Sequence, residues 1–410
     1  MIMIRDFLFL PKEERKHRWV VYFLFLLLFE LFLGGSGQDI HITGFLTLRM
    51  VNYIVAVGLG LMYFVGGGKM AKDFITLVVL FTLLLAFAYA IAVINNSSSE
   101  NVIEDIKPLS YFYILFFFSY IFRSKFVIQK AYDVLLLSGK LMVVLYIVYI
   151  LITDILGIFD FSWAYATFIS DNFLFRGVGS AFYYKGFVFI PIAAIGFLKD
   201  KNYLWFILSV VAVYFTYTRG LYVLLVVGCL FYILRAKGVK LSVLIGILFL
   251  SYTLYQGAKY FEIFDIGEDY TEKREGGDEL RFETINQVKS EINVVSFFVG
   301  HGFGHGVKNR PVHMEMSYLE IFHKQGVIGL VFWGTVLLLI LSYNKKVPKG
   351  NKGISDFYMI SSIMIFIQSF FNPYINNPIG MGMVLVSLVC CYYFAHEITR
   401  HNSTIQLQSV

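Results

Sequence analysis

The chain has few charged residues and few cysteines for its length of 410 residues. Charged residues make up 15% of it, whereas hydrophobic residues make up 58% and the mean hydropathy is +0.69. This composition excludes a soluble fold, because no soluble core could hide so much apolar surface, and it excludes intrinsic disorder. The three cysteines, Cys229, Cys390 and Cys391, lie in apolar runs, which excludes a disulfide scaffold. What remains is an all-α polytopic membrane protein.

Apolar stretches long enough to cross ~30 Å of hydrocarbon recur along the chain. They predict about twelve transmembrane helices, near residues 19–33, 44–65, 73–94, 108–122, 134–156, 186–198, 202–218, 220–234, 240–256, 317–343, 356–371 and 378–395. Residues 1–256 therefore hold the first nine helices with short loops, 257–316 form one long loop, and 317–410 hold the last three helices and a tail. No small-residue cleavage site follows the first stretch, so we interpret it as a helix and not as a signal peptide.

Lys and Arg are unevenly distributed between the two alternating sets of connections. One set contains every short basic linker: Arg5, Lys12, Arg15, Lys16, Arg18, Lys69, Lys72, Arg123, Lys125, Lys130, Lys199, Lys201, Arg235, Lys237, Lys240, Lys345, Lys346, Lys349, Lys352 and Arg400. The other set has fewer, most of them in the loop 257–316, where acidic residues offset them. This asymmetry predicts cytoplasmic termini and an outward-facing loop 257–316. The net charge of +6 follows from it and does not indicate a nucleic-acid partner.

Ionisable residues are almost absent from the middle of the predicted spans. A proton- or ion-coupled transporter usually has such residues or broken helices there, so a membrane transporter is the less favoured alternative. Arg219 instead lies where two short spans meet with almost no loop, at the outer edge of the hydrocarbon. Either it snorkels to a lipid phosphate, or it binds an anionic ligand together with hydroxyl donors from Thr216 and Thr218. We favour the ligand.

Two more charged residues of the outward face are candidates. Asp278 is expected to cap a helix on which Arg281 projects into the middle of an apolar arc set by Ile285, Val288 and Ile292. Either Arg281 pairs with a nearby carboxylate, or the helix presses it onto a bound ligand.

Glu315 precedes a helix that Ser317 and Glu320 are expected to open with a capping box. That helix, about 27 residues and ~40 Å long, is longer than a bilayer requires, so its first turns should stand above the lipid. Glu315 would then face Arg219, either as a solvated loop charge or as a functional carboxylate. A structural pair between Glu30 and Arg49 is also expected near the outward ends of the first two spans.

Glycines and histidines cluster between 300 and 323. The glycine pattern of 300–306 lacks the strand and helix that a dinucleotide-binding loop needs, so it predicts a tight turn where the backbone approaches backbone or ligand closely. Four histidines, His301, His305, His313 and His323, have no spacing typical of a zinc site, and no cysteine accompanies them. We therefore expect no metal and no cofactor, and interpret these histidines as surface or substrate-contacting residues.

Several short motifs occur in a fixed order between Arg176 and Gly329. They are Arg176-Gly177, Thr218-Arg219-Gly220, Arg281, the glycines Gly300, Gly302 and Gly304, and Tyr318-Leu319-Glu320 followed by Gly326 and Gly329. In this order and topology the chain resembles the bacterial O-antigen polymerase and O-antigen ligase family. Ligases of that family show His-Asn where this chain has Glu315-Met316, and His313 is two residues out of register. The Glu is similar to the polymerases, so a polymerase is favoured and a ligase acting on lipid A core is the alternative.

The resemblance implies a C-type glycosyltransferase-like membrane fold and an inverting glycosyltransferase. The enzyme would join undecaprenyl-pyrophosphate-linked oligosaccharides at the periplasmic face of the bacterial inner membrane. It implies that Arg219, Arg281 and Arg176 bind the pyrophosphate and that Glu315 is the catalytic base, with His313, Tyr318 and Thr218 as secondary candidates. Arginines then take the place of a metal at the leaving group. A chain-length regulator and a flippase of the same pathway are the implied protein partners.

Overall fold

The structure is a computed structural model that describes residues 17–37, 41–43, 46–158, 173–175, 181–237 and 268–408. Within these ranges it is almost entirely helical. The strands are two short antiparallel pairs, β1 (His41–Thr43) with β2 (Leu46–Thr47) and β3 (Phe173–Phe175) with β4 (Phe182–Tyr184). The all-α prediction is confirmed.

Each predicted span within the described ranges coincides with a helix or with consecutive helical segments. The helices of the first half are α2 (Arg18–Leu33), α3 (Leu48–Val65), α4 (Lys72–Ile94), α5 (Ser99–Leu109), η2 (Ser110–Ile114), α6 (Leu115–Ile121), α7 (Lys125–Ile150) and η3 (Leu151–Ile155). Those of the second half are η4 (Lys185–Val188), α9 (Phe189–Lys199), α10 (Tyr203–Phe215), α11 (Arg219–Lys237), α13 (Glu268–Glu291), α14 (Val294–Val299), α15 (Ser317–Lys346), α16 (Lys349–Gln368) and α17 (Pro378–Gln408). The predicted span at 240–256 lies outside the described residues.

Five of the described helices are long and apolar enough to cross a membrane. They are Leu48–Val65, Lys72–Ile94, Lys125–Ile155, Ser317–Lys346 and Pro378–His396. The last packs in the centre of the bundle, with 78% of its most apolar window buried. The other helices leave many large apolar side chains exposed, such as Leu83 and Leu145, as expected where lipid is the solvent. A polytopic membrane protein follows from these helices, whereas the number of twelve and the C-type fold stay predictions.

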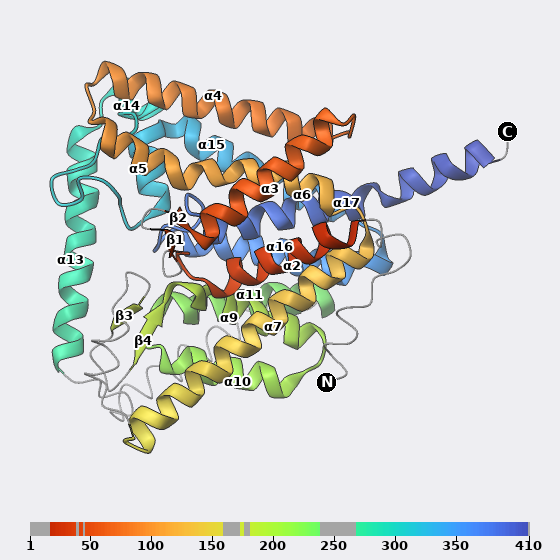
Figure 1. Ribbon diagram of the computed structural model, residues 1–410. Helices are drawn as coiled ribbons and strands as arrows, with labels where there is room; N and C mark the ends of the chain where they lie inside the picture. The colour runs from red at the N-terminus through yellow and green to blue at the C-terminus, as the bar shows by residue number, and fades with distance from the viewer. Residues whose placement is uncertain are drawn as a thin grey trace.

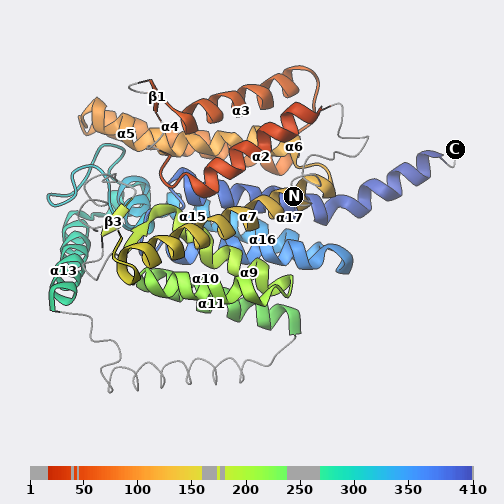
Figure 2. The same ribbon diagram turned by 60° about the horizontal axis from the view of Figure 1, so that its bottom comes forward.

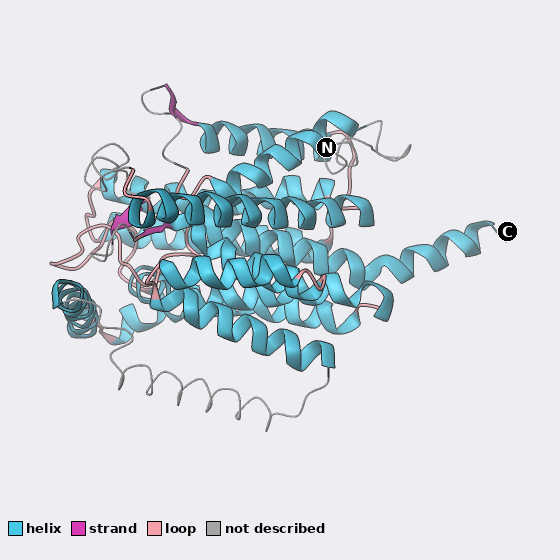
Figure 3. Ribbon diagram, turned by 90° about the horizontal axis from the view of Figure 1, so that it is seen from below, coloured by secondary structure: helices cyan, strands magenta, loops and turns pink. Residues whose placement is uncertain are grey.

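The long helices run side by side, and successive connections alternate between the two ends of the bundle (Figure 1). The short basic connections after α3, α6, α9 and α15 gather at one end, together with the start of α2 and the end of α17 (Figures 1 and 2). The other end carries both strand pairs, α14 and the turn between α10 and α11. Helix α13 lies across this second end, and Figure 3 shows it end-on beside the bundle. We call this second end the polar end.

Helix α15 has a break that the sequence analysis missed. The backbone at Gly326 is not helical, with φ 64° and ψ −163°. A Cβ there would lie 2.2 Å from the carbonyl oxygen of Phe298, so only glycine lets α14 approach this closely. The expected single straight helix over 317–343 is therefore wrong. The chain turns at Gly326, and the segment before it belongs to the polar end.

One expected structural pair is confirmed at that end. The Arg49 guanidinium donates to Glu30 Oε1 at 2.9 Å and to the carbonyl oxygen of Gly35 at 2.7 Å, and both charged side chains are almost fully buried. This pair joins the end of α2 to the start of α3. Arg49 therefore has a structural role.

Candidate functional site

Three arginines and two carboxylates form a continuous chain of ion pairs at the polar end. Arg219 donates to Asp278 at 2.8 Å, and the other carboxylate oxygen of Asp278 lies 3.3 Å from Arg281. Arg281 also donates to Glu315 Oε2 at 2.9 Å, and Arg310 donates to Glu315 Oε1 at 2.6 Å. The structure thus brings together Arg219, Arg281 and Glu315, as the sequence analysis expected. We call these five residues the arginine cluster.

Arg219 reaches the cluster from the tight turn between α10 and α11. Tyr217 has a positive φ of 46° in this turn, and Arg219 is the first residue of α11. The hydroxyls of Thr216 and Thr218 donate to the carbonyl oxygens of Val213 and Thr216 and are buried. The short hairpin is as expected. Both hydroxyl protons close the turn in this structure, and a role of the two threonines as ligand donors stays a prediction.

Asp278 and Arg281 come from one face of α13. Helix α13 begins ten residues before Asp278, at Glu268, so the predicted helix cap at Asp278 is wrong. Its carboxylate instead bridges two arginines. Thr284 and Val288 are the buried positions of this face, whereas Ile285 and Ile292 are exposed. The apolar arc is therefore displaced from the predicted one, although Arg281 does lie on the inward face.

Arg310 and Glu315 come from the loop before α15, which Asn309 holds on α13. The Asn309 side chain donates to Leu280 O at 3.3 Å and to Thr284 Oγ1 at 3.0 Å. Its backbone N–H donates to the side chain of Gln287 at 3.1 Å. Arg310 was not predicted as a site residue. Its position in the same loop, five residues before Glu315, could have indicated that it contacts this carboxylate.

The arginine cluster is open to solvent. The side chains of its five members are between 34% and 55% exposed. Three guanidinium groups face two carboxylates, so the cluster has one positive charge in excess. Guanidinium groups bind phosphate and carboxylate oxygens in the same bidentate manner. An anionic ligand can therefore compete with Asp278 and Glu315 for these arginines.

A second set of ionisable residues lies deeper, below the cluster. Lys324 Nζ lies 2.7 Å from both Asp105 Oδ1 and Glu320 Oε1, and it donates to the carbonyl oxygen of Val312 at 2.5 Å. All three charged residues are buried. Asn376 donates to the other oxygen of Glu320 at 2.6 Å. The predicted capping box is wrong: α15 does begin at Ser317, but Glu320 is used in this ion network.

His313 borders this buried network from its exposed side. Its Nδ1 lies 3.4 Å from Glu320 Oε1 and 3.5 Å from Asp105 Oδ1, and half of its side chain is exposed. The hydrogen bond with Glu320 raises the pKa of His313 above its usual value, against the opposing effect of burial. His313 therefore touches the structural network and is not a member of the arginine cluster.

The glycine turn is built for contact between backbones. Gly300, Gly302 and Gly304 all have positive φ. The N–H groups of His301 and Gly302 donate to the carbonyl oxygens of His323 and Lys324, which the break at Gly326 leaves without helical partners. The N–H of Gly304 donates to Asp105 at 2.7 Å. The prediction of a tight turn with close backbone approach is confirmed.

Three of the four histidines gather against the end of α13. The rings of His301, His305 and His323 lie with centroids 4.8 to 5.4 Å apart. Glu291 Oε2 lies 3.3 Å from His305 Nε2 and 3.7 Å from His323 Nε2. Burial, followed by the neighbouring His305, lowers the pKa of His301.

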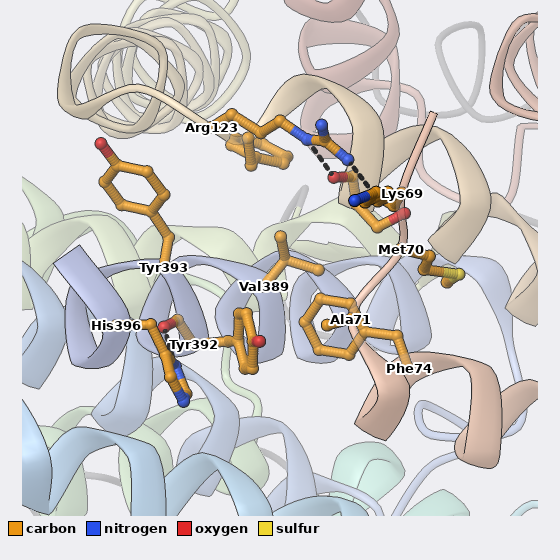
Figure 4. A pocket seen from close by; sticks show the side chains of 11 residues that line it. Lys69, Met70, Ala71, Phe74, Arg123, Val389, Tyr392, Tyr393 and His396 are labelled. Carbon is orange, nitrogen blue, oxygen red and sulfur yellow. Dashed lines mark hydrogen bonds between the residues drawn. The ribbon is translucent and has the colours of Figure 1, made fainter. Parts of the chain in front are cut away.

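The remaining candidates lie elsewhere. Tyr318 donates to the carbonyl oxygen of Phe366 at 2.7 Å and packs on Phe370, so it joins α15 to α16. Arg176 lies outside the described residues. A cavity of about 140 Å³ lies at the opposite end of the bundle, between Lys69, Arg123, Tyr392 and His396 (Figure 4). That cavity is too far from the arginine cluster to take part in its chemistry.

The fold and the site define a class: an all-α, multi-pass membrane protein with an open cluster of arginines and carboxylates at one end. No family model matches the chain. Over 387 residues, however, it is 26% identical to an O-antigen polymerase from Shigella flexneri, and the match covers 92% of this chain and 95% of the relative. Because the match covers 92% of the chain, it includes most of the first 160 residues, which contain none of the motifs described above. The predicted resemblance to O-antigen polymerases is confirmed.

Proposed function

We propose that the protein is an O-antigen polymerase, a glycosyltransferase-type enzyme that joins lipid-linked oligosaccharide repeats. The observation that carries the proposal is the convergence of Arg219, Arg281 and Glu315 in one open cluster. The similarity to an O-antigen polymerase over nearly the whole chain supports it.

The donor sugar in this reaction carries undecaprenyl pyrophosphate at its anomeric carbon. A hydroxyl oxygen of the acceptor sugar attacks that carbon, the bond to the pyrophosphate oxygen breaks, and the hydroxyl proton passes to a base. The leaving group departs as an anion, so guanidinium groups aimed at it lower the barrier. A single displacement inverts the anomeric centre. The membrane holds the lipid. The distribution of Lys and Arg supports an outward-facing cluster, and with it a reaction at the periplasmic face of the inner membrane.

The arginines bind the pyrophosphate by exchanging one anion for another. In the structure, Asp278 bridges Arg219 and Arg281 with distances of 2.8 and 3.3 Å. A pyrophosphate can replace that carboxylate, because its oxygens accept from guanidinium groups in the same geometry and carry more charge. Arg310, the third arginine of the cluster, is a further binding residue, because it already donates to Glu315. Arg176 lies outside the described residues, and its proposed role is also to bind the pyrophosphate.

Glu315 acts as the base in this scheme. Arg281 and Arg310 each hold one of its oxygens and so fix the direction of its carboxylate. When the pyrophosphate takes over Arg281, Oε2 of Glu315 becomes available to accept the proton of the sugar hydroxyl. The pairing therefore serves both to position the base and to release it when the donor is bound.

The experiment uses the purified full-length chain in lipid and an undecaprenyl-pyrophosphate-linked oligosaccharide. A polymerase produces a ladder of longer glycans that stay attached to the lipid. If glycan appears on added lipid A core instead, the protein is a ligase. If neither product forms and the substrate enters sealed vesicles, it is a transporter. The proposal also predicts co-purification with a chain-length regulator and with a flippase of the pathway.

A further inference from the structure

His323 is buried without a hydrogen-bond partner for its ring. Its side chain is 0% exposed, and neither Nδ1 nor Nε2 makes a hydrogen bond to the described protein atoms. The buried Nε2 of His301, beside it, also lacks one. Buried polar groups are nearly always satisfied by protein, water or a bound ion. Three imidazole nitrogens without partners, next to the carboxylate of Glu291, point to a bound cation.

The ligand atoms around this position have the spacing of a metal site. One side-chain atom from each of Glu291, His305 and His323 lies within 4.8 Å of the other two. The closest pairs are 3.3 and 3.7 Å apart. In a tetrahedral zinc site with bonds of about 2.0–2.1 Å, neighbouring ligand atoms lie roughly 3.4 Å apart. Small side-chain adjustments would therefore bring these three atoms onto one ion, with the fourth tetrahedral position left for another ligand.

We propose that Glu291, His305 and His323 bind a divalent transition-metal ion, with zinc as the best fit. Two imidazoles and one carboxylate are a donor set that zinc accepts in proteins. The ion pairs of Glu291 within the described part of the chain are with these two histidines, so no Lys or Arg there already neutralises it. The ion would supply the missing positive charge and a partner for one ring nitrogen of His323.

The neighbouring cluster shows what a filled site looks like in this protein. Asp105, His313 and Glu320 also bring potential ligand atoms together. There, however, the ammonium group of Lys324 sits 2.7 Å from both carboxylates and takes the place of a cation. The two clusters thus differ in their cation: Lys324 provides it in one, and no Lys or Arg of the described residues provides it in the other.

The role of the metal is structural. It ties together three elements: the end of α13 at Glu291, the glycine turn at His305, and the first segment of α15 at His323. Arg281 lies ten residues before Glu291 on α13, which corresponds to about 15 Å of helix. The ion therefore steadies the helix that carries Asp278 and Arg281 and does not touch the reacting groups. Because its ligands come from three elements, their sequence spacing shows no zinc signature.

The test measures metal content in the full-length protein without a polyhistidine tag. After removal of metal with a chelator, the protein is dialysed against Zn²⁺, or against Co²⁺ as a spectroscopic probe. We expect about one Zn²⁺ per chain and the intense visible absorption of tetrahedral Co²⁺. Both are lost in Glu291→Gln and in His305→Ala, whose side chains are partly exposed, so that these variants should still fold. His313→Ala, in the cluster that Lys324 fills, is the matched control and retains both signals.

The proposal is overturned if the wild-type chain takes up no metal, or if Glu291→Gln and His305→Ala bind as much as the wild type and His313→Ala do. Folding of each variant is checked by its thermal unfolding midpoint in the absence of metal. Neither result bears on the polymerase activity, since the readout is metal content and absorption. A failure here is thus separate from a failure of the proposed function.

Discussion

Arg281 contacts two carboxylates at once, and this explains why an arginine is needed at its position. Its Nε donates to Glu315 at 2.9 Å while Nη1 lies 3.3 Å from Asp278. A lysine has one ammonium group on a flexible side chain and cannot bind both carboxylates in this fixed geometry. Arg281 could be predicted because it projects into an expected apolar arc, and Glu315 because it precedes the start of a long helix and matches the family resemblance. Arg310 could not, because it is a loop arginine with neither feature.

We expect Arg219→Ala and Arg281→Ala to abolish polymer formation, with losses of at least ~10²-fold for each removed donor to the leaving group. Lys at either site should restore only part of the rate, because the fork of donors is lost. The assay is the rate of ladder growth on the lipid-linked substrate, with the amount of folded protein measured in parallel.

Arg235 provides a matched control on the same helix. It lies near the other end of α11, where it pairs with Asp356 at 3.1 Å, so Arg235→Ala should keep nearly full activity. Full activity in Arg219→Lys would instead indicate that Arg219 only snorkels to lipid phosphate.

His313 gives the protein a pH-dependent contribution to stability. Its pKa is raised by the hydrogen bond with Glu320, with Asp105 adding to the effect and Lys324 opposing it. A group whose pKa is raised on folding stabilises the fold when protonated. This contribution is complete below the unfolded pKa of about 6.5 and is lost as the pH rises through the native pKa.

The thermal unfolding midpoint of the wild type should therefore exceed that of His313→Asn by more at about pH 6 than at about pH 9. Intrinsic fluorescence of the protein in detergent can follow both transitions. An equal gap at the two pH values would contradict a charged interaction between His313 and Glu320.

At the scale of the elements, the break in α15 decides the shape of the polar end. The sequence analysis identified the start of this helix but expected it to run straight, because nothing in its own residues forbids a helix at Gly326. The reason for the break is tertiary: α14 packs its backbone against that glycine. Contacts of this kind cannot be inferred from local sequence. Helix α13 also continues through Gly276 and Gly277, which local propensity would have made a boundary, although a Cβ at either glycine would meet no atom within 4 Å.

Gly326→Ala should destabilise the protein, because φ 64° with ψ −163° is a conformation that only glycine adopts easily. The strain alone is worth about 1–3 kcal/mol, and the contact with Phe298 adds to it. Gly334→Ala, eight residues later in the same helix, is the control, since its Cβ would meet no atom within 4 Å. It should be neutral or stabilising by roughly 0.5–1 kcal/mol. The measurement is the thermal unfolding midpoint of each variant. Equal midpoints would contradict a helix break at Gly326.

At the scale of the whole molecule, the basic connections lie at one end of the bundle, and helix α13, which carries Asp278 and Arg281, lies at the other (Figure 1). Hydrophobic runs and the distribution of Lys and Arg predicted this separation, since both follow from the physics of the bilayer. They could not predict the loop 257–316 in the same way, because its helices are held by specific contacts such as those of Asn309. The sequence thus predicts which connections lie at which end of the bundle, but not the geometry of the site.

The separation predicts which end faces outward. In intact cells, a membrane-impermeant thiol reagent should label a cysteine introduced at Glu279 and miss one at Lys349, both of which are exposed positions. Cys229 is first replaced by serine, and Cys390 and Cys391 are buried. The reverse labelling pattern would place the arginine cluster in the cytoplasm.

The central claim is that Glu315 is the base of a polymerisation carried out by the arginine cluster. The most direct test is the rate of ladder growth by purified Glu315→Gln, with binding of the lipid-linked donor measured on the same sample. We predict unchanged donor binding with a rate about 10²–10⁴-fold lower, a partial rate for Glu315→Asp, and a much smaller loss for His313→Ala. Near-normal polymerisation by Glu315→Gln would contradict the account and assign the base to another residue.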